Sequence, residues 1–489
     1  MVEKYDVIVV GAGSAGSVVT GRVVEAGHST LLLEAGGSDS NPMIHELSGM
    51  GSLWHGPEDW DYYTVPQAHA ANRRLHLPRG KVLGGSHALN AMIWVRGAAD
   101  DYDGWAAAGN PGWGWFDVQP IFEQIESVVD VVTDYPLAPI QQSILDAGIE
   151  IGLEHNPNYN GDQLDGISQQ HITVRDGTRF NSYMAYVRPL VGESRLTVTT
   201  GAWVHRLLVD GAKVIGVEYE KEGELHTAHA GEVVLSAGAL DTPRILLRSG
   251  VGPADELRAL GIEPVLDLPG VGKNLHDHLL APVIFATDKR EVAPPARGVS
   301  ATQTHLFWRS DPSLPVPDTQ PINFSVPMYQ PGMVGPAGGF SLMAGIVSPK
   351  SRGSVTLGGP DPRDSILIDL AALEHPDDVA SLVASVSQCR ELGAASALAD
   401  GWGARELYPE PGTTDLEDYV RRTVVTYHHQ VGTAKMGTDA LAVVDPTLRV
   451  HGLAGLSVVD ASIMPTITTG NTNAPAILIG EKGARFLLS

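Results

Sequence analysis

Several kinds of feature are scarce in this sequence, and each scarcity excludes a class of protein. Cys389 is the single cysteine among 489 residues, so no disulfide can form within the chain, which is usual in reducing compartments. No segment approaches the roughly 18 consecutive apolar residues that a membrane-spanning helix needs. Basic residues are in the minority, with 33 Lys and Arg against 57 Asp and Glu and a formal net charge of −24. This acidity argues against nucleic acid and anionic membrane surfaces as partners.

The remaining absences concern targeting and repetition. The first strand-like run begins almost at once, without the apolar region of a signal peptide. Together with the charge and the lone cysteine, this predicts a cytoplasmic protein. The 55 glycines and 33 prolines are scattered, without a low-complexity linker or an internal repeat. The hydrophobic fraction of 43% is ordinary for a globular protein, and the length suits two or three domains.

The densest pattern in the chain is a glycine motif near its start. The apolar run Tyr5–Val10 leads into Gly11, Gly13 and Gly16, and a segment with helical periodicity and a second apolar run follow. This order predicts a strand, turn, helix and strand that bind a dinucleotide. The first glycine permits a tight turn, the second admits a pyrophosphate to the backbone, and the third lets the helix pack on the strand.

The second apolar run ends in a carboxylate, Glu34, 18 residues after Gly16. An acid at about 20 residues binds a ribose hydroxyl in dinucleotide-binding proteins. A glycine turn in an ordinary α/β unit is the alternative for an isolated motif, but the strands on both sides favour the dinucleotide site. The motif does not distinguish FAD from NAD.

The later composition predicts a second part of the molecule. Residues 37–76 are loop-rich, and such segments often cover a cofactor. Alternating apolar and polar residues at 196–236 predict a small β-meander that returns to the main sheet. Further strand-like runs predict an antiparallel sheet, and a helix is expected after them; the strands are expected at 322–326, 340–347, 353–357 and 366–370, and the helix at 376–392.

A second glycine-rich segment carries a family resemblance. It contains Gly84-Gly85-Ser86-His87, with Asn90 three residues further on. Here the chain resembles the glucose-methanol-choline (GMC) oxidoreductases, in which a Gly-Gly-Ser-Ser-x-x-Asn segment lies along the flavin; His87 replaces the second Ser. With further motifs in the family's order, the resemblance spans about residues 5–485. It implies FAD as the cofactor and an alcohol as the substrate.

The histidine in this segment raises the question of how the flavin is held. Some family members carry a flavin linked covalently to a histidine in this region, but by spacing the attachment position of choline oxidases falls on Leu89. The resemblance therefore implies non-covalent FAD with His87 packed against the flavin edge. Covalent attachment through His87 stays open.

The resemblance places the chemistry near the carboxyl end of the chain. In the segment Tyr427–Gly437 the histidine that fits the family is His429, the expected general base, while His428 points elsewhere if the backbone is extended. Asn471 stands where the family has a second His or an Asn. A neutral imidazole can accept the hydroxyl proton, the Asn471 amide can hold the substrate oxygen, and hydride would pass to flavin N5.

The resemblance also implies a set of FAD contacts spread over all of these motifs. The expected contacts are Gly11, Gly13, Ser14, Ala15, Gly16, Glu34, Ala35, Gly84, Gly85, Ser86, Asn90, Ala91, Val204, Ala237, Gly238, Asp460, Ala461, Asn471 and Thr472. No metal is expected, because His276 and His278 flank Asp277 but no further ligand stands at a suitable spacing.

The expected fold is α/β, or α+β when the whole chain is considered. A Rossmann-like FAD-binding domain would comprise residues 1–125, 176–277 and 440–489. A substrate-binding domain, an antiparallel sheet backed by helices, would comprise residues 126–175 and 278–439.

The expected function is FAD-dependent oxidation of an alcohol to a carbonyl, with the flavin reoxidised by O2 or another acceptor. A non-redox lyase on the same fold is the alternative, since some family members cleave hydroxynitriles. An NAD-binding protein of another class is a third possibility. Sugars, aromatic alcohols, pyridoxine-like rings and aliphatic alcohols all remain open as substrates, as does the oligomeric state.

Overall fold

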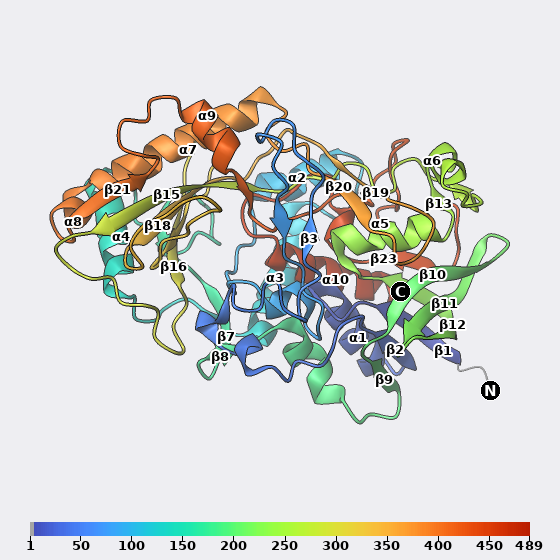
Figure 1. The fold of residues 1–489 in the computed structure, drawn as a ribbon. Helices are drawn as coiled ribbons and strands as arrows, with labels where there is room; N and C mark the ends of the chain where they lie inside the picture. The colour runs from blue at the N-terminus through green and yellow to red at the C-terminus, as the bar shows by residue number, and fades with distance from the viewer. Residues whose placement is uncertain (1–3) are drawn as a thin grey trace.

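The computed structural model describes residues 4–489 and contains two large sheets (Figure 1). The first has the strand order β10-β11-β12-β1-β2-β9, with β23 beside β12. Its strands are β1 (Lys4–Val10), β2 (Thr30–Leu33), β9 (Leu196–Thr199), β10 (Trp203–Asp210), β11 (Lys213–Lys221), β12 (Glu224–Leu235) and β23 (Leu456–Val458).

The predicted nucleotide-binding unit is the centre of this sheet. β1 pairs in parallel with β2 and β12, and α1 (Ser14–Glu25) connects β1 to β2. The strands are apolar over several consecutive residues because helices cover both faces of a parallel sheet; the Val7–Val10 and Leu31–Leu33 side chains are buried. The meander β10-β11-β12 is antiparallel. The α/β prediction is confirmed.

The second sheet is antiparallel, as expected, and lies on the opposite side of the molecule (Figure 1). The strands expected at 353–357 and 366–370 are not part of it, because they pair with each other in a separate ribbon. Its order is β21-β15-β18-β17-β16-β6, with β22 beside β15. Its strands are β6 (Gly166–Gln169), β15 (Leu279–Thr287), β16 (Thr302–Phe307), β17 (Ile322–Phe324), β18 (Phe340–Ile346), β21 (Ala404–Tyr408) and β22 (Val425–Thr426). Helix α7 (Pro376–Ala394) packs on β18 and β15.

The sequence did not indicate β15 and β16. Both are buried along almost their whole length, so they lack the alternation of a half-exposed strand. Pro282 also counts against an interior strand. It is tolerated because it falls between the residues that pair with β22 and those that pair with β21.

Short elements complete the chain. Helices are α2 (Ala99–Ala107), α3 (Trp115–Val129), α4 (Pro139–Glu150), α5 (Gly238–Arg248), α6 (Ala254–Ala259), α8 (Ser396–Ala399), α9 (Leu416–Thr423) and α10 (Asn473–Leu488). Small ribbons pair β3 (Tyr62–Tyr63) with β4 (His76–Leu77), β5 (Val131–Val132) with β7 (Ile172–Arg175), β7 with β8 (Thr178–Arg179), β13 (Val251–Gly252) with β14 (Leu266–Asp267), and β19 (Ser354–Leu357) with β20 (Ile366–Asp369).

Residues 37–76 form the expected loop-rich segment. They hold single turns of 3-10 helix, Pro42–Ile44 and Leu47–Gly49, and the strand β3. Figure 1 shows this segment between the two sheets. β6 pairs with β16 of the second sheet. The division of the chain into two domains and its boundaries stay a prediction.

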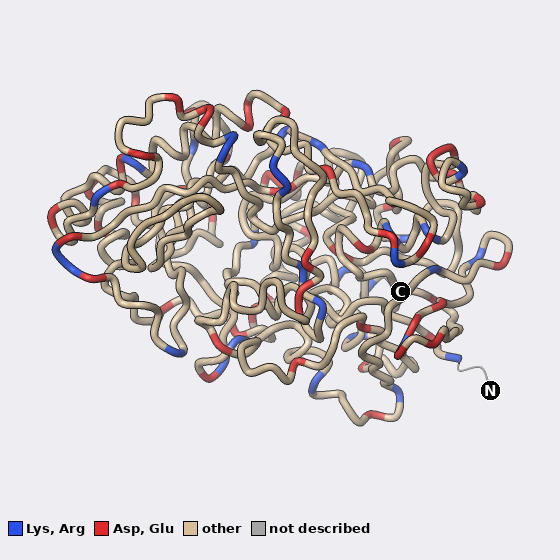
Figure 2. The backbone as a smooth tube through the Cα atoms, viewed as in Figure 1, with Lys and Arg blue, Asp and Glu red and all other residues tan. Residues whose placement is uncertain are grey.

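Charged residues are dispersed rather than gathered. Figure 2 shows acidic and basic positions scattered along the backbone, with long uncharged stretches in the interior. Across residues 4–489, no helix combines the length and apolar character that crossing a bilayer requires.

Packing of α1 against β1 depends on Gly16. A Cβ placed there would lie 2.0 Å from the Gly11 carbonyl oxygen and 2.9 Å from the Ser236 Cβ. We expect Gly16→Ala to lower the free energy of unfolding by about 2 kcal/mol or more, because backbone must move to admit the methyl group. Thermal unfolding with flavin release checks this.

Gly104 provides the matched control for that substitution. It lies in the exposed part of α2, and a Cβ there meets no atom within 4 Å. Gly104→Ala should be neutral or stabilise the protein by up to about 1 kcal/mol through helix propensity. Equal melting temperatures for both variants would contradict the packing argument.

Candidate active site

A cavity of about 600 Å³ opens between the two sheets. One end is lined by the glycine turn after β1 and by the ends of β2 and β12; the other end is lined by residues of β15, β17, β18 and the segment after β22. The cavity therefore joins a nucleotide-binding edge to a chamber in the second sheet.

The nucleotide end is shaped by close backbone contacts. Gly11 has φ +101°, and Gly85 has φ +53° and lies so near the first turn that a Cβ on it would be 2.6 Å from Gly13 Cα. Gly13 is the N-cap of α1 and offers no side chain to the first-turn N–H groups, which are unpaired within a helix. This groove admits a pyrophosphate against backbone donors, as FAD requires.

Glu34 lies at the end of β2 and faces the same groove. Its carboxylate accepts hydrogen bonds from the Ala12 N–H (3.0 Å) and the Gly36 N–H (2.8 Å). Burial raises the pKa of Glu34 to about 7, and the two N–H donors oppose that rise. Each oxygen retains a lone pair that can accept from a ribose hydroxyl, so the residues present fit the adenosine half of FAD.

The structure brings almost all of the predicted site residues together at this cavity. Those that line it are Gly11, Gly13, Ser14, Ala15, Glu34, Ala35, Gly85, Ser86, Asn90, Ala91, Val204, Ala237, Gly238, Asp460, Ala461, Asn471, Thr472 and His429. Gly16 and Gly84 stand behind the wall: Gly16 packs under Gly11, and Gly84 packs against the Asn181 amide. Their roles toward FAD stay predictions.

His87 is not where the sequence suggested. The expectation that it packs against the flavin edge is wrong for its position, because it is fully buried and does not line the cavity. Its Nδ1 lies 3.2 Å from the Ser182 hydroxyl, and its Nε2 lies 3.2 Å from both the Thr173 hydroxyl and the Asn473 amide. With both ring nitrogens engaged by protein, His87 supports the wall that carries Ser86.

Two helix N-termini meet at the cavity. The Ser14 hydroxyl at the start of α1 donates to Asn473 Oδ1 at the start of α10, at 2.7 Å. Asn473 is the first residue of α10 and Thr472 is its N-cap. Asp460 accepts from the Gly238 N–H (2.8 Å) and from the Thr242 hydroxyl (2.5 Å), so it also fixes the start of α5.

The predicted catalytic pair is close in space. Asn471 Nδ2 lies 3.3 Å from His429 Nε2. Gln320 orients this amide, because its own Nε2 donates to Asn471 Oδ1 at 3.0 Å. The Asn471 N–H therefore faces His429, whose Nε2 must be the acceptor.

A second histidine holds the far side of the His429 ring. His278 Nδ1 lies 3.0 Å from His429 Nδ1, with the ring planes nearly perpendicular at 89°. Since Nε2 of His429 accepts, its Nδ1 carries the proton and donates to His278. Burial lowers the pKa of His278 to about 3 and that of His429 well below its ordinary value, so both rings are neutral. The lone pair on His429 Nε2 is directed at the Asn471 amide, and both side chains line the cavity.

The backbone of this segment is clamped by Asp277. Its Oδ1 accepts from the His429 N–H at 2.7 Å, and its Oδ2 contacts the Thr426 hydroxyl and the Gln430 amide. Burial raises the pKa of Asp277 to about 6, against the pull of these donors. In the sequence, Asp277 and its flanking histidines stand out only as a metal motif that lacks further ligands; the contacts of Asp277 show that it holds the segment that carries His429.

His428 turns away from His429, but not for the reason expected. Its backbone is left-handed, with φ +67°, rather than extended. Its ring packs edge-on against Trp54, with centroids 5.1 Å apart. The Arg79 guanidinium donates to the His428 carbonyl at 2.5 Å, which holds this turn from the loop side.

The chamber beside His429 is apolar. Its wall is formed by Ile93, Leu280, Ile322, Phe324, Met328, Met343 and Tyr427. Tyr427 stacks on His429 with ring centroids 4.6 Å apart. Among the described residues that line the cavity from the second sheet and the segment after β22, none carries a formal charge at neutral pH.

His276 and His278 do not converge on a common point. His276 Nδ1 lies 2.6 Å from the Asn274 carbonyl and its Nε2 accepts from the Ile467 N–H at 2.8 Å, while His278 faces His429. The two side chains therefore contact different parts of the protein.

The sequence matches known proteins over almost its whole length. The family profiles described as GMC oxidoreductase match residues 5–280 and 349–480. An alcohol dehydrogenase [acceptor] of Pseudomonas putida is 35% identical, covering 99% of this chain and 96% of that protein. An oxygen-dependent choline dehydrogenase of Rhizobium etli is 33% identical over 99% of this chain and 96% of its own.

Solved structures of known enzymes have the same fold. Pyridoxine 4-oxidase from Mesorbium loti superposes with a TM-score of 0.92 at 33% identity, covering 98% of each chain. A fungal aryl-alcohol oxidase shares the fold, with a TM-score of 0.85 at 23% identity over 100% of this chain and 99% of that one. These relatives are oxidases and dehydrogenases, which does not favour the lyase alternative.

Membership of this family gives FAD as the cofactor and oxidation of a CH–OH group as the activity. The chain belongs to the GMC oxidoreductase family.

Proposed function

We propose that His429 is the general base and Asn471 the oxygen-holding group in the oxidation of a neutral, largely apolar alcohol. The observation that carries this proposal is the 3.3 Å approach of the two side chains where the glycine-lined groove meets the apolar chamber. A hydroxyl oxygen placed beside both groups could accept an N–H from Asn471 and donate its proton to His429 Nε2 in place of the direct Asn471–His429 contact.

The protein side of the reaction needs no rearrangement of protons before it starts. FAD, when bound, supplies the acceptor for the hydrogen and electron pair that leave carbon. His278 keeps the His429 proton on Nδ1, so Nε2 carries the lone pair, and a substrate hydroxyl would take the place of the Asn471 N–H as its donor. Gln320 keeps the amide N–H of Asn471 turned to the same point. Tyr427 fills one side of the His429 ring and excludes water there.

The substrate class follows from the chamber wall. Its aliphatic and aromatic side chains match an alkyl or aryl group, since burial of apolar surface contributes about 25 cal/mol per Å². Arg73 and Arg74 line the loop side of the cavity, so a cationic substrate would meet positive charge there and no carboxylate on the chamber wall. We also propose the division into domains given above, with FAD held non-covalently and O2 or another acceptor as oxidant.

Replacement of the base tests the assignment. We expect His429→Ala to slow the anaerobic bleaching of the flavin by an alcohol by about 10² to 10⁴, with FAD content unchanged. Stopped-flow absorbance at the flavin bands measures this. His428→Asn is the matched control, because that ring packs on Trp54, and it should lose far less; equal losses in both variants would remove His429 from the role.

The pH dependence of flavin reduction follows from the lowered pKa of His429. Its neutral form is the base, and burial, followed by His278, His428 and Arg79, disfavours the protonated form. As pH falls through the ordinary value of about 6.5, the ring therefore stays neutral. We expect the anaerobic reduction rate to be level between about pH 6 and 8. A decline with an apparent pKa near 6.5 would contradict the described burial.

A pair of substrates of equal shape tests the apolar chamber. 3,3-Dimethylbutan-1-ol has the form of choline without its charge. We expect its kcat/KM to be at least about tenfold higher than that of choline. This ratio corresponds to about 1.4 kcal/mol, the cost of placing the charge of choline against an apolar wall without a counterion. Steady-state assays with an artificial electron acceptor measure both. A preference for choline would show that the chamber stabilises a cation.

A further inference from the structure

We propose that His55, Asp61 and His76 form a binding site for a divalent transition metal at the mouth of the cavity. The three residues belong to the loop-rich segment between the two sheets: His55 and Asp61 precede β3, and His76 begins β4. His55 and His76 line the cavity. None of them contributes to the chemistry proposed above.

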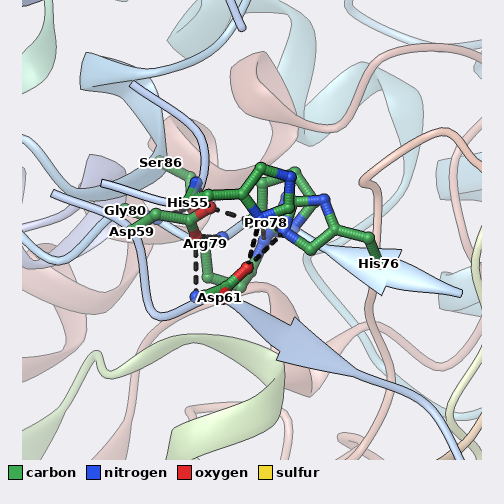
Figure 3. Close-up of polar contacts among 8 residues, drawn as sticks. All are labelled: His55, Asp59, Asp61, His76, Pro78, Arg79, Gly80 and Ser86. Atoms are coloured by element: carbon green, nitrogen blue, oxygen red, sulfur yellow. Dashed lines mark hydrogen bonds and ion pairs between the residues drawn. The ribbon is translucent and has the colours of Figure 1, made fainter. Parts of the chain in front are cut away.

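The donor atoms converge on one point, as Figure 3 shows. His55 Nδ1 lies 2.7 Å from Asp61 Oδ1, and His76 Nε2 lies 3.0 Å from the same oxygen. All three donor atoms lie within 4.8 Å of one another. Small side-chain rotations would place all three donor atoms about 2 Å from a common ion, which is the usual distance for nitrogen and carboxylate ligands.

One of these nitrogens lacks a hydrogen bond. His76 Nε2 is buried and makes no hydrogen bond to any residue of the described range, although carboxylate oxygens lie 3.0 and 3.5 Å away on Asp61 and Asp59. The His55 and His76 rings also stack, with centroids 4.1 Å apart. A metal ion satisfies both nitrogens and the carboxylate at once.

Asp59 holds this arrangement from beneath. Its side chain is fully buried, and it accepts from the backbone N–H groups of His55 (3.1 Å), Asp61 (3.0 Å) and Arg79 (2.8 Å). His55 and Asp61 both have left-handed backbones, with φ +60° and +53°. Non-glycine residues adopt this conformation rarely, and here it turns both side chains toward His76.

The donor set selects the class of metal. Two imidazoles and one carboxylate suit Zn²⁺, Co²⁺, Ni²⁺ or Cu²⁺ rather than Mg²⁺ or Ca²⁺. The His55, Asp61 and His76 side chains are 56%, 45% and 19% exposed, so an ion can enter from solvent and keep water as a further ligand.

A bound ion would link residues of the loop-rich segment that lines the cavity. Asp59 accepts a hydrogen bond from the Arg79 N–H, and the Arg79 guanidinium donates to the His428 carbonyl next to His429. Trp54, adjacent to His55, packs on the His428 ring. A bound ion would therefore rigidify the segment that touches the catalytic turn, and its role is structural.

Metal binding to the FAD-loaded full chain, without an added histidine tag, tests this proposal. After treatment with EDTA and desalting, we expect titration calorimetry with Zn²⁺ to show one site per chain, and Co²⁺ to give visible absorption beyond the flavin bands. His55→Ala, Asp61→Asn and His76→Ala should each weaken binding by about tenfold or more. Zn²⁺ should also raise the melting temperature of the parent by linkage and not that of these variants.

His69→Ala is the matched control, since His69 is an exposed histidine of the same segment that is outside the cluster. It should bind Zn²⁺ as the parent does. Flavin content and melting temperature in EDTA show that each variant is folded, and His55, being the most exposed ligand, is the least able to disturb the fold. Absence of binding to the parent, or binding that survives in His55→Ala and Asp61→Asn, would overturn the proposal.

Discussion

The hydrogen bond between the His278 and His429 rings is the contact around which the centre of this molecule is arranged. At 3.0 Å between two Nδ1 atoms, one ring must donate and the other accept. Which ring donates depends on the contacts of the other ring nitrogens. The Asn471 amide, oriented by Gln320, donates to Nε2 of His429, so the proton of the His429 ring is on Nδ1. Four side chains thus determine one tautomer.

This chain of contacts requires both sheets to be in place. His278 lies at the start of β15, Gln320 precedes β17, and Asn471 precedes α10, which packs on α1 of the first sheet. Asp277 ties the His429 backbone to the same strand. The turn that carries His429 is therefore positioned by elements from both halves of the chain, and these elements meet at the cavity between the sheets.

Local patterns in the sequence were sufficient for the nucleotide-binding half. A glycine turn, an apolar strand on each side and a terminal carboxylate are features of neighbouring residues. They predicted β1, α1 and β2 correctly, with Glu34 directly after β2. The family resemblance supplied His429 and Asn471, whose proximity the structure shows. Gln320 had no signal, because it lies in a connection far from Asn471 in sequence and its contact arises only when the second sheet forms.

The same limit explains the misplacements. His87 follows a flavin-associated motif, so sequence reasoning put it at the cofactor, but the turn of the 3-10 helix Gly85–Ala88 sends its ring behind the wall to Ser182 and Thr173. His55 and His76 are separated by a loop without periodicity, and they meet because β3 pairs with β4, with Tyr63 opposite His76. When two residues meet through strand pairing across an irregular loop, their spacing in the sequence does not predict the contact.

Burial links the selectivity of the chamber to the reactivity of the base. The apolar wall that suits an uncharged alcohol also withdraws water from His429, which lowers its pKa. A lowered pKa makes His429 a weaker base than a free imidazole. The neutral ring alone would therefore abstract a hydroxyl proton poorly. With FAD bound to take up the hydrogen and electron pair from carbon, His429 would hold the hydroxyl proton as an imidazolium while a neutral carbonyl forms. The two N-termini, of α1 and α10, open on that same cavity and favour negative charge there. The low polarity that excludes water and cations thus strengthens the attraction between the charges that the reaction itself creates.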